Sequence, residues 1–266
     1  MRLATVRRPG ATVAVRLEDD HAVELDEPDV GALLRHPDWR ARAVAGGPVR
    51  STTELDFAPV VPKPEKIICV GLNYRQHILE MGRDLPTHPT LFAKFAPALI
   101  GAHDDIVLPA ASTAMDWEAE LAVVLGHGNE IAGVTVLNDV TARDWQYRTT
   151  QWLQGKTFAA TTPVGPYLVV VEPGERVPAM ELSCEVDGER MQSASTGDLV
   201  FGPEDLVDYV SAVLPFAPGD LIATGTPGGV GHAREPRHYL IDGAVVTTAI
   251  AGLGECRNRC RAEKPA

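Results

Sequence analysis

Short apolar segments separated by turns restrict the folds that this chain can adopt. Six segments have the β-branched, apolar composition typical of strands: AELAVVL, AGVTVLND, PYLVVV, LSCEVDG, DLIATG and AVVTTAI. The chain also contains 24 glycines and 21 prolines, which favour turns. Only residues 142–152 and 203–213 are predicted to form longer helices, the latter because Pro203 precedes acidic residues. We therefore expect an α+β fold that is mostly β-structure.

Two prolines predict a domain boundary near residue 62. In VVPKPEK, Pro62 and Pro64 interrupt regular backbone pairing. We predict a small N-terminal domain over residues 1–62, with a short helix near 31–35, and a main domain over residues 63–266. The main domain opens with IICVGL, a predicted buried strand. A predicted helix follows, with Asn73 near its N-cap and Gly82 just past its end.

Composition and charge exclude several classes of partner. The formal net charge is −12 and the isoelectric point is about 5.1, which argues against nucleic acid or an anionic membrane as the main partner. No apolar run approaches the roughly 20 residues of a transmembrane helix. The N-terminus lacks the apolar region of a signal peptide, and the four cysteines include no CxxC pair. We therefore expect a cytoplasmic protein with reduced thiols.

Three carboxylates are candidates for a metal site. Glu118 and Glu120, in 115-MDWEAELAVVL-125, lie two residues apart in a predicted strand, so their side chains share one face. A hairpin centred near Gly128 would place Asp139 within about a residue of being opposite Glu118. Oxygen ligands suit Mg²⁺, Mn²⁺ or Ca²⁺. The spacing also suits a solvated strand face, so both interpretations remain open at this point.

A histidine and a carboxylate form a second candidate pair. His77 and Glu80 are three residues apart on a predicted helix, so their side chains can meet. A carboxylate beside a histidine raises its basicity, which suits a general base that activates water. An ordinary surface pair without function is the alternative that the spacing leaves open.

The remaining motifs do not support a phosphate-binding loop, a serine hydrolase or a zinc protease. The GKT at 155–157 lacks the first glycine of a phosphate-binding loop, because Thr150 stands there. The glycine-rich 225-GTPGGVG-231 lacks the GxGxxG pattern, and such a loop is more often a tight turn. The chain contains neither GxSxG nor HExxH, so a serine hydrolase or a zinc protease is not predicted.

Taken together, these segments resemble the fumarylacetoacetate hydrolase family. The similar segments occur in order: VGLNYRQHILE, LFAKFAPALIG, DWEAELAVVLG, IAGVTVLNDVTARDWQ, QWLQGKTFAATTPVGPYLV and TGTPGGVG. They extend from about Lys66 to the end, about three quarters of the chain. The N-terminal residues resemble the small leading domain of many bacterial members. One departure is the short connection GHGNE, where family members usually have a longer connection with a helix.

The resemblance implies a mixed β-sandwich or roll, with residues 63–266 as the catalytic domain. It implies a divalent metal, Mg²⁺ or Mn²⁺, bound by Glu118, Glu120 and Asp139. The remaining implied site residues are the catalytic His77, Glu80 and Lys156 and the substrate-binding Arg143, Gln146 and Thr226. It also implies that residues 73–85 act as a lid that is mobile without substrate.

Family substrates are 2-oxo acids, which implies a function. We expect a metal-dependent hydrolase that cleaves a C–C bond in an acylpyruvate-like acid, through a metal-stabilised enolate and water activated by His77. Two alternative reactions use the same site, namely decarboxylation of oxaloacetate-type acids and isomerisation of a 2-hydroxyhepta-2,4-diene-1,7-dioate-type acid in aromatic catabolism. A non-catalytic metal-binding scaffold is the less favoured alternative. The family also implies a homodimer.

Overall fold

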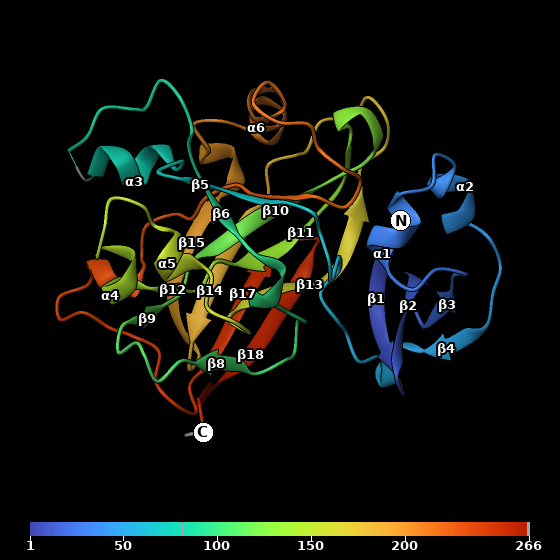
Figure 1. The fold of residues 1–266 in the computed structure, drawn as a ribbon, viewed down its shortest axis with the longest axis horizontal. Helices are drawn as coiled ribbons and strands as arrows, with labels where there is room; N and C mark the ends of the chain where they lie inside the picture. The colour runs from blue at the N-terminus through green and yellow to red at the C-terminus, as the bar shows by residue number, and fades with distance from the viewer. Residues whose placement is uncertain (81, 265–266) are drawn as a thin grey trace.

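Two β-sheets form the centre of the computed structural model, which describes residues 1–80 and 82–264 (Figure 1). The larger sheet has 11 strands, in the order β4-β3-β2-β1-β13-β11-β10-β16-β5-β6 with β7 beside β13. Its strands are β1 (Arg2–Arg8), β2 (Ala11–Leu17), β3 (His21–Glu24), β4 (Val49–Ser51), β5 (Ile67–Gly71), β6 (Thr90–Lys94), β7 (Leu99–Ile100), β10 (Ala119–Leu125), β11 (Ile131–Asn138), β13 (Thr162–Val170) and β16 (Leu221–Ala223).

The smaller sheet packs against one face of the larger sheet. Its five strands lie in the order β15-β14-β17-β18-β8. They are β8 (Ile106–Leu108), β14 (Glu181–Val186), β15 (Glu189–Ser195), β17 (Val245–Ile250) and β18 (Gly254–Ala262). A separate two-stranded ladder joins β9 (Met115–Asp116) to β12 (Thr141–Ala142). The predicted fold, mostly β-structure with sandwiched sheets, is confirmed, as are all six predicted strand segments.

The alternation of side chains along β10 divides the core in two. Leu121 and Val123 point into the apolar core between the two sheets. Ala122 and Val124 point to the opposite face, into a second core that also contains Trp39. Because both faces are covered, every residue of β10 is buried. Glu120 precedes Ala122 by two residues, so it lies on the face of the second core.

Helices are short and lie around the sheets (Figure 1). They are α1 (Val30–Leu34), α2 (Trp39–Ala43), α3 (Arg75–Glu80), α4 (Arg143–Gln146), α5 (Leu153–Lys156) and α6 (Pro203–Ser211), with 3₁₀ turns η1 (Thr52–Glu54), η2 (Ala96–Ala98), η3 (His127–Asn129), η4 (Thr196–Asp198) and η5 (Gly231–Ala233). The predicted helices near 31–35 and over 203–213 are confirmed as α1 and α6. Among the described residues, no helix has the length and apolar character to cross a membrane.

The predicted helix over residues 142–152 is wrong, because the chain breaks it into α4 and α5. Between them, the Thr149 hydroxyl donates to the carbonyl of Gln151 at 3.1 Å and accepts from its N–H at 3.2 Å. Such local side-chain bonds compete with the helical ladder, and a β-branched residue is a weak helix former.

Asn73 does not cap α3, which begins two residues later. Its buried amide instead joins distant segments, donating to the carbonyls of Phe201 at 3.0 Å and Thr224 at 2.8 Å. Asp198 satisfies the start of the helix by accepting from the N–H of Gln76 at 2.9 Å. Gly82 follows the helix with φ +67°, as predicted.

The first 62 residues continue the larger sheet. Strand β1 pairs antiparallel with β13, and Leu3 lies opposite Leu168. The second core contains residues from both sides of the predicted boundary, among them Leu33 and Leu168. The predicted division at residue 62 therefore separates two segments that share a sheet and a core.

We predict that the chain unfolds in one cooperative transition and that Leu168→Ala lowers the stability of the whole. Leu168 is fully buried, so its truncation leaves a cavity that costs about 2–5 kcal/mol of the free energy of unfolding. Calorimetry shows whether unfolding is a single transition, and urea denaturation measures the free energy of unfolding. The exposed Val213→Ala is the control. Two separate transitions, with only one shifted by Leu168→Ala, would contradict the shared core.

Candidate metal centre and active site

The β10–β11 hairpin brings the predicted carboxylates together. Ala119 pairs with Asn138, and the next pair outward joins Glu118 to Asp139, whose N–H donates to the Glu118 carbonyl at 2.8 Å. The short GHGNE connection contains the 3₁₀ turn η3, in which Gly128 adopts φ +62°. The predicted register is confirmed, and the shortness of this connection does not disturb it.

Glu118, Glu120 and Asp139 form a buried cluster. Each offers a carboxylate oxygen, and these oxygens lie within 4.8 Å of one another. The residues are only 6%, 1% and 0% exposed. The alternative interpretation, a solvated strand face, is therefore wrong for this pair of glutamates.

Three cations surround these carboxylates. Lys156 donates from Nζ to Glu118 at 2.7 Å and to Asp139 at 2.8 Å. Arg143 contacts the other oxygen of Glu118 at 2.6 Å. Lys94, at the end of β6, donates to Asp139 at 2.7 Å. Sequence reasoning assigned no role to Lys94, although it lies in the quoted LFAKFAPALIG segment and its place among apolar residues was an available signal.

Burial and charge act in opposite directions on the pKa values of this cluster. Burial raises the pKa of Glu120 well above its usual value, and the charges of Asp139 and Glu118 raise it further. Burial also acts to raise the pKa of Asp139, but Lys156 and Lys94 outweigh it and the pKa is lowered. Burial lowers the pKa of Lys156, whereas Asp139 and Glu118 raise it more, so the ammonium stays charged.

The donor set fits a hard divalent cation. All three candidate ligands are carboxylate oxygens, the type that Mg²⁺ and Mn²⁺ prefer. Each carboxylate has several acceptor positions, so the contacts with lysine and arginine do not exhaust them. With Asp116, four buried carboxylates face the three cations Lys94, Arg143 and Lys156. A cation bound here would offset the repulsion between Glu120 and its neighbours Asp139 and Glu118, which contributes to the raised pKa of Glu120.

Asp116 holds Arg143 and the glycine-rich loop in place. In the sequence analysis it was not assigned a role. It is fully buried and accepts from the backbone N–H groups of Gly231 at 2.7 Å and His232 at 2.9 Å. Its second oxygen also accepts from Nε of Arg143 at 2.8 Å. Asp116 therefore orients Arg143 and ties the loop over residues 225–232 to the segment between β9 and β10 that contains Glu118. Its position in the same DWEAE segment was the available signal.

A cavity of about 370 Å³ opens beside this cluster; Glu118 lines it, whereas Glu120 and Asp139 lie behind Glu118 and are not part of its wall. Aromatic side chains form part of its wall, including Phe92, Tyr147 and Trp152. Six of the predicted site residues line it: His77, Glu118, Arg143, Gln146, Lys156 and Thr226. The structure therefore places most of the predicted catalytic and substrate-binding residues around one cavity.

His77 faces this cavity beside the glycine-rich loop. A Cβ at position 228 would lie 3.0 Å from Nδ1 of His77, so Gly228 allows the loop to pass close to the imidazole. Burial lowers the pKa of His77, and the opposing charges of Glu80 and Glu118 do not restore it. Among the described residues no hydrogen bond joins His77 to Glu80, so Glu80 acts on the imidazole through its charge. At neutral pH His77 is therefore a neutral base.

Thr226 and Gln146 are held by neighbouring groups. The Thr226 hydroxyl donates to the carbonyl of Ala119 at 3.0 Å and accepts from Nε2 of Gln192 at 2.8 Å. The Gln146 carbonyl oxygen accepts from Nη1 of Arg143 at 2.9 Å. Their side chains thus have fixed orientations at the wall of the cavity.

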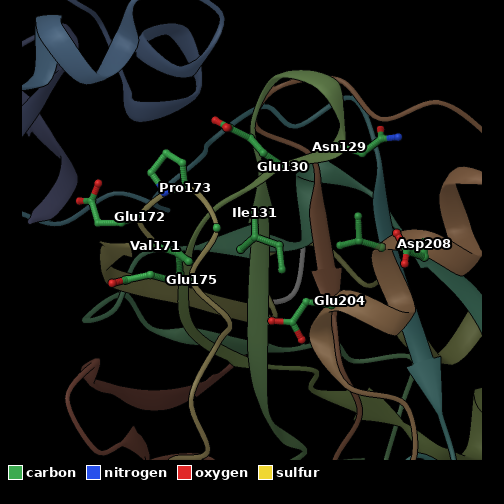
Figure 2. A pocket seen from close by; sticks show the side chains of 11 residues that line it. Asn129, Glu130, Ile131, Val171, Glu172, Pro173, Glu175, Glu204 and Asp208 are labelled. Carbon is green, nitrogen blue, oxygen red and sulfur yellow. The ribbon is translucent and has the colours of Figure 1, made fainter.

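A different cavity, of about 210 Å³, is also lined by acidic side chains (Figure 2). Glu130, Glu172, Glu175, Glu204 and Asp208 lie around it, on separate loops and on α6. Glu204 is engaged by the N–H of Val177 at 2.8 Å and by Arg176 at 3.3 Å. These acidic groups are spread around the rim, unlike the converging oxygens of the Glu118 cluster.

The fold and the site together define a β-sandwich protein with a buried carboxylate centre beneath an open cavity. Residues 66–261 match the model of the fumarylacetoacetate hydrolase C-terminal family, and the chain belongs to that family. The resemblance inferred from the sequence segments is thereby confirmed.

Members of this family with several activities are similar to the chain. A mitochondrial oxaloacetate tautomerase of Homo sapiens is 42% identical over 80% of this chain and 71% of its own. The 2-hydroxyhepta-2,4-diene-1,7-dioate isomerase of Mycobacterium marinum is 29% identical, with a TM-score of 0.76 over 100% of both chains. The fumarylpyruvate hydrolase of Pseudomonas aeruginosa, solved with Mn²⁺ and pyruvate, is 30% identical, with a TM-score of 0.66 over 74% of this chain and 90% of its own.

We predict that Asp116→Asn lowers the free energy of unfolding by about 3 kcal/mol, because it removes a buried charge beside Arg143 and turns an amide donor toward backbone donors. Urea denaturation at neutral pH measures the change. Asp19→Asn is the matched control, since its exposed pair with Arg2 should contribute less than about 1 kcal/mol. Equal stability of the two variants would contradict the central position of Asp116.

Proposed function

We propose that this protein is a divalent-metal-dependent hydrolase that cleaves a C–C bond in acylpyruvate-like 2-oxo acids. The observation that supports it is a single cavity lined by a neutral base, His77, by Glu118 of the carboxylate cluster, and by the cations Arg143 and Lys156. The similarity to a fumarylpyruvate hydrolase solved with Mn²⁺ and pyruvate favours the same substrate class. Mg²⁺ or Mn²⁺, bound by Glu118, Glu120 and Asp139, would polarise the substrate carbonyl and stabilise negative charge on oxygen.

The cavity wall is suited to the carboxylate end of a 2-oxo acid. Arg143 is buried and its pKa is raised, because Glu118 and Asp116 outweigh the effect of burial, so it is a permanent cation. Gln146 and Thr226 add polar groups at the same wall. In this proposal the three side chains hold the substrate carboxylate, with the acyl chain lying against the aromatic side chains Tyr147 and Trp152.

His77 and Lys156 have different roles in the proposed reaction. His77 accepts a proton from the attacking water, which it can do because it is neutral at pH 7. The charge of Glu80 favours the imidazolium that results. Lys156, held as an ammonium by Glu118 and Asp139, stabilises negative charge that develops on the substrate.

A second candidate reaction is enol–keto tautomerisation of oxaloacetate. The 42% identity to the human oxaloacetate tautomerase favours it, over most of the catalytic domain. The same general base suffices, because tautomerisation only moves a proton between carbon and oxygen. Decarboxylation of oxaloacetate-type acids and isomerisation of a 2-hydroxyhepta-2,4-diene-1,7-dioate-type acid remain further alternatives on the same residues.

Product analysis with and without metal tests the proposal. Acetylpyruvate, fumarylpyruvate and oxaloacetate are incubated with the protein and Mg²⁺, and NMR identifies the products. We expect pyruvate plus a free carboxylic acid from at least one acylpyruvate, and loss of this activity in EDTA. Tautomerisation of oxaloacetate without any C–C cleavage would contradict the hydrolase and favour the second candidate.

We predict that the rate depends on neutral His77. Because its pKa lies below the ordinary value of 6.5, kcat/KM should be constant near pH 7 and fall as the pH drops through that pKa. His77→Asn should lose at least about 100-fold in kcat and this pH dependence. His36→Asn, at a histidine paired with Glu27, should retain both. An unchanged acidic limb in His77→Asn would exclude His77 as the base.

A further inference from the structure

A second histidine, His232, lines the cavity of about 370 Å³ that contains the proposed substrate site. It lies in the 3₁₀ turn η5, at the end of the glycine-rich loop. Its side chain is partly exposed, and its Nε2 has no hydrogen-bond partner within residues 1–80 and 82–264. The proposed reaction assigns this imidazole no role, although it is positioned to contact a bound substrate.

Two tyrosines hold the imidazole of His232. Its Nδ1 lies 2.9 Å from the hydroxyl of Tyr239. The ring of Tyr147 packs against it, with centroids 5.2 Å apart and planes inclined by 31°. Tyr239 lies outside the described wall of the cavity, so Nδ1 points away from that space. Nε2, on the other side of the ring, is the nitrogen left to face it.

The main chain of His232 is anchored beside Arg143. Its N–H donates to Oδ2 of Asp116 at 2.9 Å, and the same oxygen accepts from Nε of Arg143 at 2.8 Å. The imidazole therefore has a fixed position relative to Arg143, which holds the 2-oxo acid carboxylate in the proposed function. An acyl chain that lies against Tyr147 meets this imidazole, because the two rings are in contact.

The charges around His232 favour an anionic ligand. Burial lowers the pKa of His232, and the positive charges of Arg143 and Arg237 lower it further against the opposing charge of Asp116. The imidazole is therefore neutral at pH 7. Arg83 lines the same cavity and adds another positive charge. Such a positive potential favours a substrate with a second negative group.

A neutral imidazole can donate a hydrogen bond to that group. When the Tyr239 hydroxyl donates to Nδ1, the ring proton lies on Nε2. A bond from Nε2 to a carboxylate is charge-assisted, so it is stronger than a bond between two neutral groups.

We propose that His232 determines substrate specificity by donating a hydrogen bond from Nε2 to a carboxylate at the end of the acyl group. The preferred acylpyruvates then carry a second carboxylate, as fumarylpyruvate does, whereas acetylpyruvate lacks this contact. This inference rests on the proposed hydrolase activity and specifies its substrate class. Tyr239 is a positioning residue, because it contacts His232 and not the substrate.

The kinetic test compares fumarylpyruvate with acetylpyruvate in His232→Phe, which keeps a ring beside Tyr147 but removes both nitrogens. We expect kcat/KM for fumarylpyruvate to fall about 10- to 100-fold, mainly through KM, as for the loss of a hydrogen bond to a charged group. The value for acetylpyruvate should change less than about twofold, which also shows that the variant is folded. Tyr209→Phe, on α6, is the control and should change neither value.

A second variant tests the positioning role of Tyr239. Tyr239→Phe leaves His232 in place but removes the hydroxyl that orients its ring. We expect KM for fumarylpyruvate to rise by less than in His232→Phe, with kcat for both substrates unchanged.

A binding measurement separates this proposal from the hydrolase assignment. Calorimetry in Mg²⁺ compares 2-oxoheptanedioate with 2-oxoheptanoate, which differ only in the terminal carboxylate and have no 4-oxo group to permit cleavage. We expect the wild type to bind the dicarboxylate at least about tenfold more tightly, and His232→Phe to lose this preference.

Three results would overturn the role of His232, even in an active hydrolase. They are equal binding of the two acids by the wild type, an unchanged preference in His232→Phe, and equal losses of kcat/KM for both acylpyruvates. A wild type that keeps the binding preference but cleaves neither acylpyruvate would overturn the hydrolase assignment alone.

Discussion

Seven ionisable side chains buried against one another at the end of the β10–β11 hairpin are the constraint on which the rest of the structure depends. The carboxylates are Asp116, Glu118, Glu120 and Asp139, and the cations are Lys94, Arg143 and Lys156. A buried charge without its partner costs about 3–5 kcal/mol, so each cation must reach its carboxylate. Since the cations come from β6, α4 and α5, their pairing fixes three separate segments against one hairpin.

This constraint also explains why the site lies where the sheet ends. Along β10, Ala122 and Val124 turn toward the apolar core formed with the N-terminal residues, and Glu120 continues the same face. On this face, Val124 and Ala122 are apolar, whereas Glu120 and Glu118, the next two side chains toward the start of the strand, are acidic. Burial of the apolar side chains stabilises the register of the β10–β11 hairpin, and this register places Asp139 beside Glu118.

The parts of the fold that could be predicted from the sequence are those determined locally. The strands and the hairpin follow from alternation and turn residues, and so does the meeting of Glu118 with Asp139. The partners of Lys94 and Asp116 could not be identified from the local pattern, because they lie 45 and 27 residues away in the chain. The predicted helix over 142–152 failed for a local reason, the competing bonds of Thr149. Asn73 lies near the start of α3 as predicted, but its amide forms long-range bonds instead of capping the helix.

The family relationship leaves the reaction open for a physical reason. Tautomerisation and C–C hydrolysis both need a cation-rich oxygen site and a neutral base, and this chain provides them with Lys156, Arg143 and His77. They differ in the need for water at the base while substrate is bound. The two reactions therefore differ in whether water must reach His77, and Gly228 lets the glycine-rich loop pass close to this imidazole. A side chain at position 228 would press against Nδ1 of His77, so the glycine keeps the imidazole free beside the loop.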